Sequence, residues 1–166
     1  MRAAVALGSN LGDRLGILHA ARKAILGLSN VKPPTLSSAA YETEPVGCEP
    51  GAGKFLNAVF EFEYEGDAAS LLEQLLGIEQ ALGRTRDHAK NISRTIDIDL
   101  LNCGDQQTHT ELLQLPHPRM HLRKFVLQPL AGIRPDLILP GQQKTMTLLL
   151  ENLNESDDVV LFAHEW

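Results

Sequence analysis

FLNAVFEFEYE, residues 55–65, is the stretch of sequence that decides the fold. Successive side chains of a β-strand point to opposite faces of the sheet, so every second residue shares a face. One face of this segment is entirely apolar and consists of Leu56, Ala58, Phe60, Phe62 and Tyr64. The other face is mixed and consists of Phe55, Asn57, Val59, Glu61 and Glu63. The pattern predicts a strand that turns its apolar face to the core.

Helices and further strands are predicted on both sides of this strand. After it, Asp67 is a typical helix N-cap, and apolar residues at helical spacing continue until Gly83, which ends the helix. Before it, residues 3–7 form a short apolar run that suits a buried strand, and a helical pattern follows Asp13. Residues 35–43 are typical of another strand.

The segment RTIDIDLL, residues 94–101, supplies the last strand of the core. The resulting order, β-α-β-β-α-β, predicts an α+β fold with a ferredoxin-like core, in which two helices cover one face of an antiparallel sheet. We expect a single domain over residues 1–166, with this core in about residues 1–104 and a C-terminal elaboration in about residues 105–166. The arrangement leaves the opposite sheet face uncovered.

Asp97 and Asp99 stand two residues apart on one face of the last predicted strand, and Ile96 and Ile98 occupy its other face. Two neighbouring carboxylates repel each other unless a cation lies between them, and oxygen ligands of this kind suit Mg²⁺ or Mn²⁺ together with phosphates. We expect this pair, Asn57 and Phe55 on the uncovered sheet face. The alternative is a solvated strand face, because charged residues are mostly exposed.

Charge is distributed unevenly along the chain. The formal net charge is −6, which argues against a general nucleic-acid binder. Residues 84–94 nevertheless carry four Arg or Lys and one Asp, a net +3 that leaves −9 for the remainder. A basic loop that leads into the two aspartates suits an anionic, metal-chelated ligand, although solvated basic loops are also common on protein surfaces.

The composition predicts a cytoplasmic protein without a membrane segment. No apolar run approaches the length of a transmembrane helix, and the first ten residues turn polar too soon for a signal peptide. Cys48 and Cys103 are isolated and lack the Cys-x-x-Cys spacing of zinc sites. Two such cysteines are no disulfide scaffold, so a reducing compartment is the simplest interpretation.

A second unusual segment is PHPRMHLRKFVL, residues 116–127. His117 lies between two prolines, which hold it in an extended context, and Arg119 and Arg123 follow closely. The proline after His117 argues against a helix that would bring it and His121 onto one metal ion. We interpret the histidine and an arginine as phosphate contacts; the alternative is a polar loop that caps the following helix.

Two glycine-containing motifs carry less weight. GAGK, residues 51–54, lacks the first glycine and the final Ser or Thr of a P-loop, and it precedes a strand. The Gly8-Ser9-Asn10 turn combined with the later Asp-x-Asp resembles template-independent nucleotidyltransferases. In those enzymes both parts lie on one short helix-to-strand unit, whereas here the whole predicted core separates Ser9 from Asp97.

Taken together, these segments resemble the 6-hydroxymethyl-7,8-dihydropterin pyrophosphokinase family of folate biosynthesis. The matching segments follow the order and spacing of the family and are ALGSNLGD (6–13), FLNA (55–58), IEQALGR (78–84), RTIDIDLL (94–101) and LPHPRMHLRKFVLQPL (115–130). The resemblance implies a ferredoxin-like fold and transfer of the β,γ-pyrophosphoryl group of ATP to the pterin hydroxymethyl oxygen, with release of AMP. Asn-Ile-Ser at residues 91–93 departs from the Gly-Pro that usually precedes the Arg, which predicts a reshaped loop.

The resemblance also implies roles for individual residues. Asp97 and Asp99 would hold two Mg²⁺ ions and, together with Arg84 and Arg94, form the catalytic group. The ATP phosphates would be contacted by Arg84, Arg94, His117 and Arg123, with Arg86 closing over the site. The pterin would be bound by Asn57, by the backbone around Thr43 and Val46, and by the rings of Phe55 and Phe125.

The expected partners are therefore small molecules, ATP and the pterin, with neither nucleic acid nor membrane, and a monomer is predicted. Two alternatives stay open. One is a non-catalytic ferredoxin-like module that binds a nucleotide or pterin as a sensor. The other is a nucleotidyltransferase, which would release pyrophosphate instead of AMP.

Overall fold

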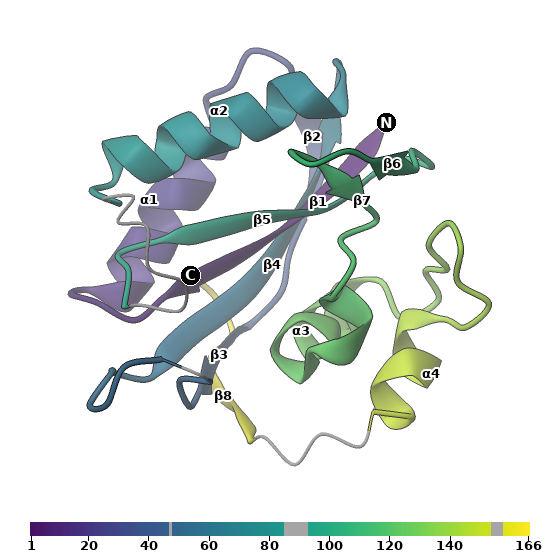
Figure 1. Ribbon diagram of the computed structural model, residues 1–166. Helices are drawn as coiled ribbons and strands as arrows, with labels where there is room; N and C mark the ends of the chain where they lie inside the picture. The colour runs from purple at the N-terminus through teal and green to yellow at the C-terminus, as the bar shows by residue number, and fades with distance from the viewer. Residues whose placement is uncertain (47, 85–92, 154–157) are drawn as a thin grey trace.

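The computed structural model describes residues 1–46, 48–84, 93–153 and 158–166 (Figure 1). Its helices and strands, in chain order, are β1 (Arg2–Ser9), α1 (Arg14–Leu26), β2 (Val31–Ser37), β3 (Ala40–Thr43), β4 (Phe55–Tyr64), α2 (Ala68–Ala81), β5 (Asp97–Cys103), β6 (Thr108–His109), β7 (Gln114–Leu115), the 3₁₀-helix η1 (Met120–Leu122), α3 (Lys124–Ile133), α4 (Met146–Glu151) and β8 (Val159–Ala163). The fold is mixed α/β. In its described parts, no helix is long and apolar enough to span a membrane.

One antiparallel sheet carries the fold. Its strand order is β5-β1-β4-β3-β8, and β2 also pairs with β4. Figure 1 shows α1 and α2 on one side of this sheet and α3 and α4 on the other. The central pair is β1 with β4, in which Gly8 lies opposite Asn57, and β1 also places Gly8 opposite Asp97 of β5. The register therefore brings two strands with polar side chains to the same end of the sheet.

The predicted strand over residues 35–43 is wrong as a single element. It consists of β2 and β3, which both pair with β4 but are separated at residues 38–39. The Ser38 hydroxyl accepts a hydrogen bond from the Val59 N–H at 2.9 Å, and this side-chain contact stands at the break. Pairing in β2 jumps from Lys32 to Leu36, because the two prolines between them have no N–H to donate.

The apolar face of β4 packs as predicted. Phe60, Phe62 and Tyr64 are almost fully buried in the larger core, which also contains the apolar faces of α1 and α2. The predicted N-cap Asp67 is confirmed, since it accepts a hydrogen bond from the Ser70 N–H at 2.9 Å. Asp13, after which a helical pattern was predicted, also acts as an N-cap and accepts a hydrogen bond from the Gly16 N–H at 3.1 Å. Each cap satisfies a backbone donor that the first turn of its helix leaves without a partner.

The expectation of an uncovered second sheet face is wrong for most of that face. A second core lies there, and its buried residues are Ala4, Val59, Leu101, Met120, Val126, Leu127, Leu130, Leu139 and Met146. These residues come from the sheet and from the C-terminal elaboration, whose apolar helix face needs a surface to cover. This second core leaves one cavity beside Arg2, Glu61, Asn102 and Arg134 and another at the end of the face near Asn57 and Asp97.

Candidate functional site

A cavity of about 260 Å³ lies at this end of the sheet, between β1, β4, β5 and the start of α3. It is lined by Gly8, Thr43, Glu44, Val46, Cys48, Phe55, Asn57, Arg84, Arg94, Asp97, Asp99, Arg119, Arg123 and Phe125. Most of the residues predicted from the sequence are therefore brought together. Arg86 lies outside the described residues.

Asp97 and Asp99 form the acidic side of the cavity. Between them, Ile98 points into the larger core, so strand alternation places both carboxylates on the cavity side. Asp97 is paired with two arginines, with Arg84 Nη1 at 2.6 Å from Oδ1 and Arg94 Nη1 at 2.9 Å from Oδ2. The carboxylate charge of Asp97 is therefore already balanced by side chains of the cavity.

Asp99 is held much less firmly. Its ion pair within the described residues is with Arg123, at 3.7 Å between Nη1 and Oδ2. Burial, followed by the negative charge of Asp97, raises the pKa of this carboxyl to about 6 against the opposing effect of three neighbouring arginines. A bound cation would stabilise the ionised form of such a half-buried carboxylate beside a like charge.

The protein supplies only part of a metal coordination sphere. No group of three or more His, Cys, Asp or Glu in the ranges that the structure describes is arranged to hold an ion. Two adjacent carboxylates still fit Mg²⁺, because this ion commonly takes one or two carboxylates and completes its shell with water and substrate phosphates. The donor set therefore suits a metal that arrives with a phosphate ligand.

Glu79 lies beneath Arg84 and was assigned no role by the sequence analysis. Its side chain is buried, and Oε1 accepts a hydrogen bond from the Ile98 N–H at 2.7 Å and pairs with Arg84. Burial raises the pKa of this carboxyl. Glu79 follows Leu71 and Leu75 at helical spacing, and this acidic residue in an apolar stripe was the signal that could have revealed it.

The opposite side of the cavity is aromatic and amide-bearing. Asn57 is 7% exposed, and its Nδ2 donates a hydrogen bond to the Thr43 hydroxyl at 2.7 Å. Phe55 and Phe125 contribute rings from β4 and α3, and the Arg123 guanidinium lies 5.5 Å from the centre of the Phe125 ring. A Cβ atom on Gly8 would stand 3.2 Å from Asn57 Oδ1, so glycine keeps this acceptor accessible.

His117 does not line this cavity. It lines a neighbouring one of about 170 Å³ together with His109 and His121. The ring Nδ1 of His117 accepts a hydrogen bond from the backbone N–H of Arg119 at 3.3 Å. The backbone N–H of His117 donates to the Leu101 carbonyl at 2.8 Å. Burial, followed by the charges of Arg123 and Arg119, lowers the pKa of His117 to about 4, so the imidazole is neutral near pH 7.

Four lining residues were not among the predicted site residues: Gly8, Glu44, Cys48 and Arg119. Arg119 is the most relevant because it is exposed and adds a further cation beside Arg123. Its position two residues after His117 was the available signal. The cavity thus combines an aromatic and amide end with an end where arginines surround two carboxylates, which suits a flat heterocycle beside a polyanion.

Comparisons with known proteins agree with this arrangement. Residues 4–135 match the family model described as 7,8-dihydro-6-hydroxymethylpterin-pyrophosphokinase (HPPK). The Haemophilus influenzae 2-amino-4-hydroxy-6-hydroxymethyldihydropteridine pyrophosphokinase is 42% identical over 139 residues, which cover 84% of this chain and 85% of that protein. The Bacillus subtilis protein of the same name is 44% identical over 129 residues, covering 78% of this chain and 75% of that protein.

A solved structure supports the fold. Wild-type Plasmodium falciparum HPPK-DHPS superposes with a TM-score of 0.68 at 13% sequence identity and covers 90% of this chain. The present chain spans 44% of that longer chain. The resemblance inferred from the sequence motifs is therefore confirmed, and the chain belongs to the 7,8-dihydro-6-hydroxymethylpterin-pyrophosphokinase family.

Proposed function

We propose that this chain transfers the pyrophosphoryl group of ATP to the hydroxymethyl oxygen of 6-hydroxymethyl-7,8-dihydropterin and releases AMP. The observation that carries the proposal is one cavity in which Asn57 and two phenylalanines lie across from the Asp97–Asp99 pair and its arginines. The names of the relatives point to the same reaction in folate biosynthesis. The aromatic and amide end of the cavity matches the pterin, and the end with the carboxylates and arginines matches the ATP phosphates.

The pterin end is assigned to β4 and α3. Asn57 holds a fixed orientation through Thr43, so its amide can form paired hydrogen bonds with the amide edge of the ring. Phe55 and Phe125 bind the ring faces, as aromatic side chains do in small-molecule sites. The backbone around Val46, which also lines the cavity, completes this end.

The phosphate end is assigned to the carboxylates and arginines. Asp97 and Asp99 would hold Mg²⁺, which neutralises phosphate charge when bound, and family resemblance suggests two such ions. Arg84, Arg94 and Arg123 now pair with these aspartates, so a polyphosphate entering the cavity meets three guanidinium groups within reach. Phosphoryl-type transfer depends mainly on such positioning and charge neutralisation.

The phosphate contact predicted for His117 stays a prediction, and the structure suggests a further role for this residue. Its neutral ring and its backbone bond to Leu101 fasten the segment between β7 and η1 to β5. This attachment holds Arg119 at the cavity. In this proposal His117 contributes hydrogen bonding, and the positive charge comes from the arginines.

The decisive test is product analysis. Protein, ATP and Mg²⁺ are incubated with and without 6-hydroxymethyl-7,8-dihydropterin, and nucleotides are separated by chromatography. Pterin-dependent AMP supports the proposal. Release of pyrophosphate would instead indicate nucleotidyl transfer, and binding of pterin or ATP in calorimetry without AMP would indicate a sensor module.

Replacing Asn57 with alanine is expected to raise the KM for the pterin at least about tenfold, about 1.4 kcal/mol, because the amide hydrogen bonds are lost. The KM for ATP should stay within about twofold. Steady-state kinetics measure both constants. Thr43→Val is the matched comparison, since it removes only the hydroxyl that orients Asn57, and its effect should be smaller. Equal rises in both KM values would contradict the assignment.

Asp99 is expected to titrate near pH 6 in the metal-free protein, because burial and Asp97 raise its pKa to about 6. Carbon-detected NMR of the aspartate carboxyl groups measures this pKa. Asp67 is an internal reference with a lowered pKa, caused by its hydrogen bonds from Ser70. Saturating Mg²⁺ together with a non-hydrolysable ATP analogue should move the Asp99 titration to lower pH, since metal and proton compete for the carboxylate. An unmoved titration would exclude Asp99 as a ligand.

The finer structural assignments are proposals as well. A ferredoxin-like core is supported by the position of β1 between β5 and β4 and by two helices on one sheet face (Figure 1). A single domain, a monomer and a cytoplasmic location stay predictions. Sedimentation of the purified chain would test the monomer.

A further inference from the structure

We propose that Glu61 and Arg134 are positioning residues, which fix helix α3 on the sheet and thereby place Arg123 and Phe125 in the cavity. Both residues belong to a cluster of charged side chains at the C-terminal end of α3, whereas the cavity with Asp97 and Asp99 lies at its N-terminal end. The inference rests on the proposed function. Neither Glu61 nor Arg134 lines this cavity.

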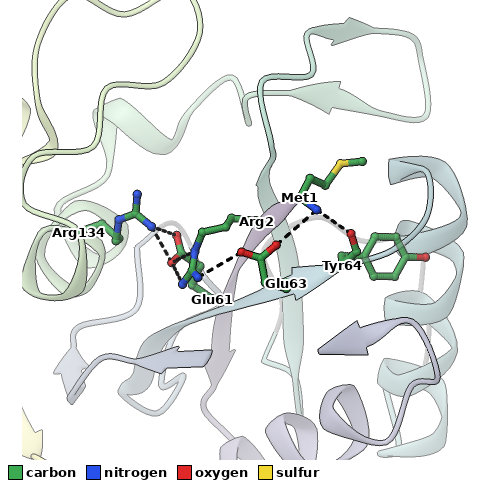
Figure 2. Close-up of polar contacts among 6 residues, drawn as sticks. All are labelled: Met1, Arg2, Glu61, Glu63, Tyr64 and Arg134. Atoms are coloured by element: carbon green, nitrogen blue, oxygen red, sulfur yellow. Dashed lines mark hydrogen bonds and ion pairs between the residues drawn. The ribbon is translucent and has the colours of Figure 1, made fainter. Parts of the chain in front are cut away.

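Glu61 is the centre of this cluster (Figure 2). It is 1% exposed, and Arg134 Nη1 donates to both of its carboxylate oxygens, at 2.9 and 3.2 Å. Arg2 Nε donates to Oε1 at 2.7 Å. One buried carboxylate therefore joins the first residue of β1, the middle of β4 and the residue that follows α3.

A second layer holds Arg2 in place. Its Nη1 pairs with Glu63 Oε1 at 3.4 Å, and the N-terminal ammonium of Met1 pairs with Glu63 Oε2 at 3.4 Å. The same ammonium donates to the Tyr64 carbonyl at 3.0 Å. These contacts, drawn in Figure 2, give Glu61 a fixed anchor on the sheet.

The lengths of the two elements connect this cluster to the cavity. Asn57 and Glu61 share a face of β4 and are four residues apart, about 13 Å at 3.3 Å per residue. Phe125 and Arg134 are nine residues apart, about 13.5 Å along a helix at 1.5 Å per residue. Arg134 contacts Glu61, and Phe125 and Asn57 line the same cavity, so β4 and α3 meet at two separate points.

Apolar packing alone does not define this alignment. Val126, Leu127 and Leu130 bury α3 against the sheet, but apolar contacts are non-directional and are compatible with small slides of the helix. A buried carboxylate that two guanidinium groups bind at fixed angles accepts one arrangement. Pro129, inside α3, has no N–H to donate, so the first turn of α3 depends more on its tertiary contacts.

The experiment compares Arg134→Met with the unchanged chain in the full-length protein. The Kd for 6-hydroxymethyl-7,8-dihydropterin is measured by calorimetry with Mg²⁺ and a non-hydrolysable ATP analogue, and hydrogen exchange is followed for the amides of residues 124–128. We expect about a tenfold rise in Kd and faster exchange, because the helix loses its anchor. Arg134→Lys, which keeps the charge, should recover part of both.

Arg22→Met is the matched control. Arg22 lies on the other side of the sheet, where it stacks 4.5 Å from the Trp166 ring and donates to the Ser37 hydroxyl at 3.3 Å. The Arg22→Met substitution should lower the unfolding midpoint without changing the Kd for the pterin or the hydrogen exchange of α3. The inference would be overturned if Arg134→Met lowered the unfolding midpoint but left both the Kd for the pterin and hydrogen exchange in α3 unchanged. If the methionine variant does not fold, Arg134→Lys provides the same comparison. If the unchanged chain binds no pterin, the proposed function fails, and hydrogen exchange still decides whether this cluster holds α3.

Discussion

Replacing Asp97 or Asp99 with asparagine is expected to lower pterin-dependent AMP release at least about a hundredfold, about 2.7 kcal/mol in the activation free energy. Asparagine keeps the size of the side chain but removes the negative charge that a divalent cation requires. In Asp97→Asn the arginines at 2.6 and 2.9 Å also lose their counter-charge. Initial rates at saturating ATP and Mg²⁺ measure the effect.

Asp136→Asn provides the control for this pair. Asp136 is exposed, follows α3 and lies outside the cavity, so its rate should stay within about twofold. Circular dichroism should show both site variants to be folded, because neither aspartate packs in a core. Near-normal rates for Asp97→Asn and Asp99→Asn would remove the proposed metal site.

Replacing Phe62 with alanine is expected to lower the free energy of unfolding by about 3–5 kcal/mol. Phe62 is fully buried in the larger core, and its ring centre lies 5.4 Å from that of Phe60. Removing the ring costs its transfer free energy and leaves a cavity that the strand cannot close. Since domains of this kind are stable by about 5–15 kcal/mol, the loss is a large share of the total. Urea unfolding with an unchanged m-value measures it.

Phe162→Ala makes the same chemical change at an exposed position. Phe162 is 48% exposed on β8, an edge strand, and the Arg14 guanidinium lies 5.6 Å from its ring centre. Its effect should be no more than about 1 kcal/mol. If the two variants lost similar free energy, the larger core would not be the main source of stability.

The sequence predicted the elements whose pattern repeats over many residues. Residues 55–65 alternate cleanly, so the strand and its buried face were predictable, as were the two capped helices. Asp97 and Asp99 could be placed on one face by the same alternation. Alternation also placed Asn57 on this face, and the family resemblance then added its pterin-binding role and Phe125.

Other features depended on contacts between distant parts of the chain. The break between β2 and β3 is set by how Ser38 meets β4, and this pairing has no signature within residues 35–43. The position of α3 over the second sheet face follows from three-dimensional packing, as does the burial of Glu61. His117 was placed by its rigid surroundings, yet its ring is held by the Arg119 N–H and its backbone by the Leu101 carbonyl.

Strand β4 forms a wall shared by two compartments: its aromatic side chains fill the core beneath α1 and α2, and Asn57 on its other face borders the cavity. Because side chains alternate strictly, inserting or deleting one residue between Asn57 and Phe60 would reverse the face of one relative to the other. Such a change would either expel aromatic rings from the core or turn Asn57 away from the pterin. We therefore expect related chains to vary in length between β3 and β4, while the number of residues from Asn57 to Tyr64 stays constant.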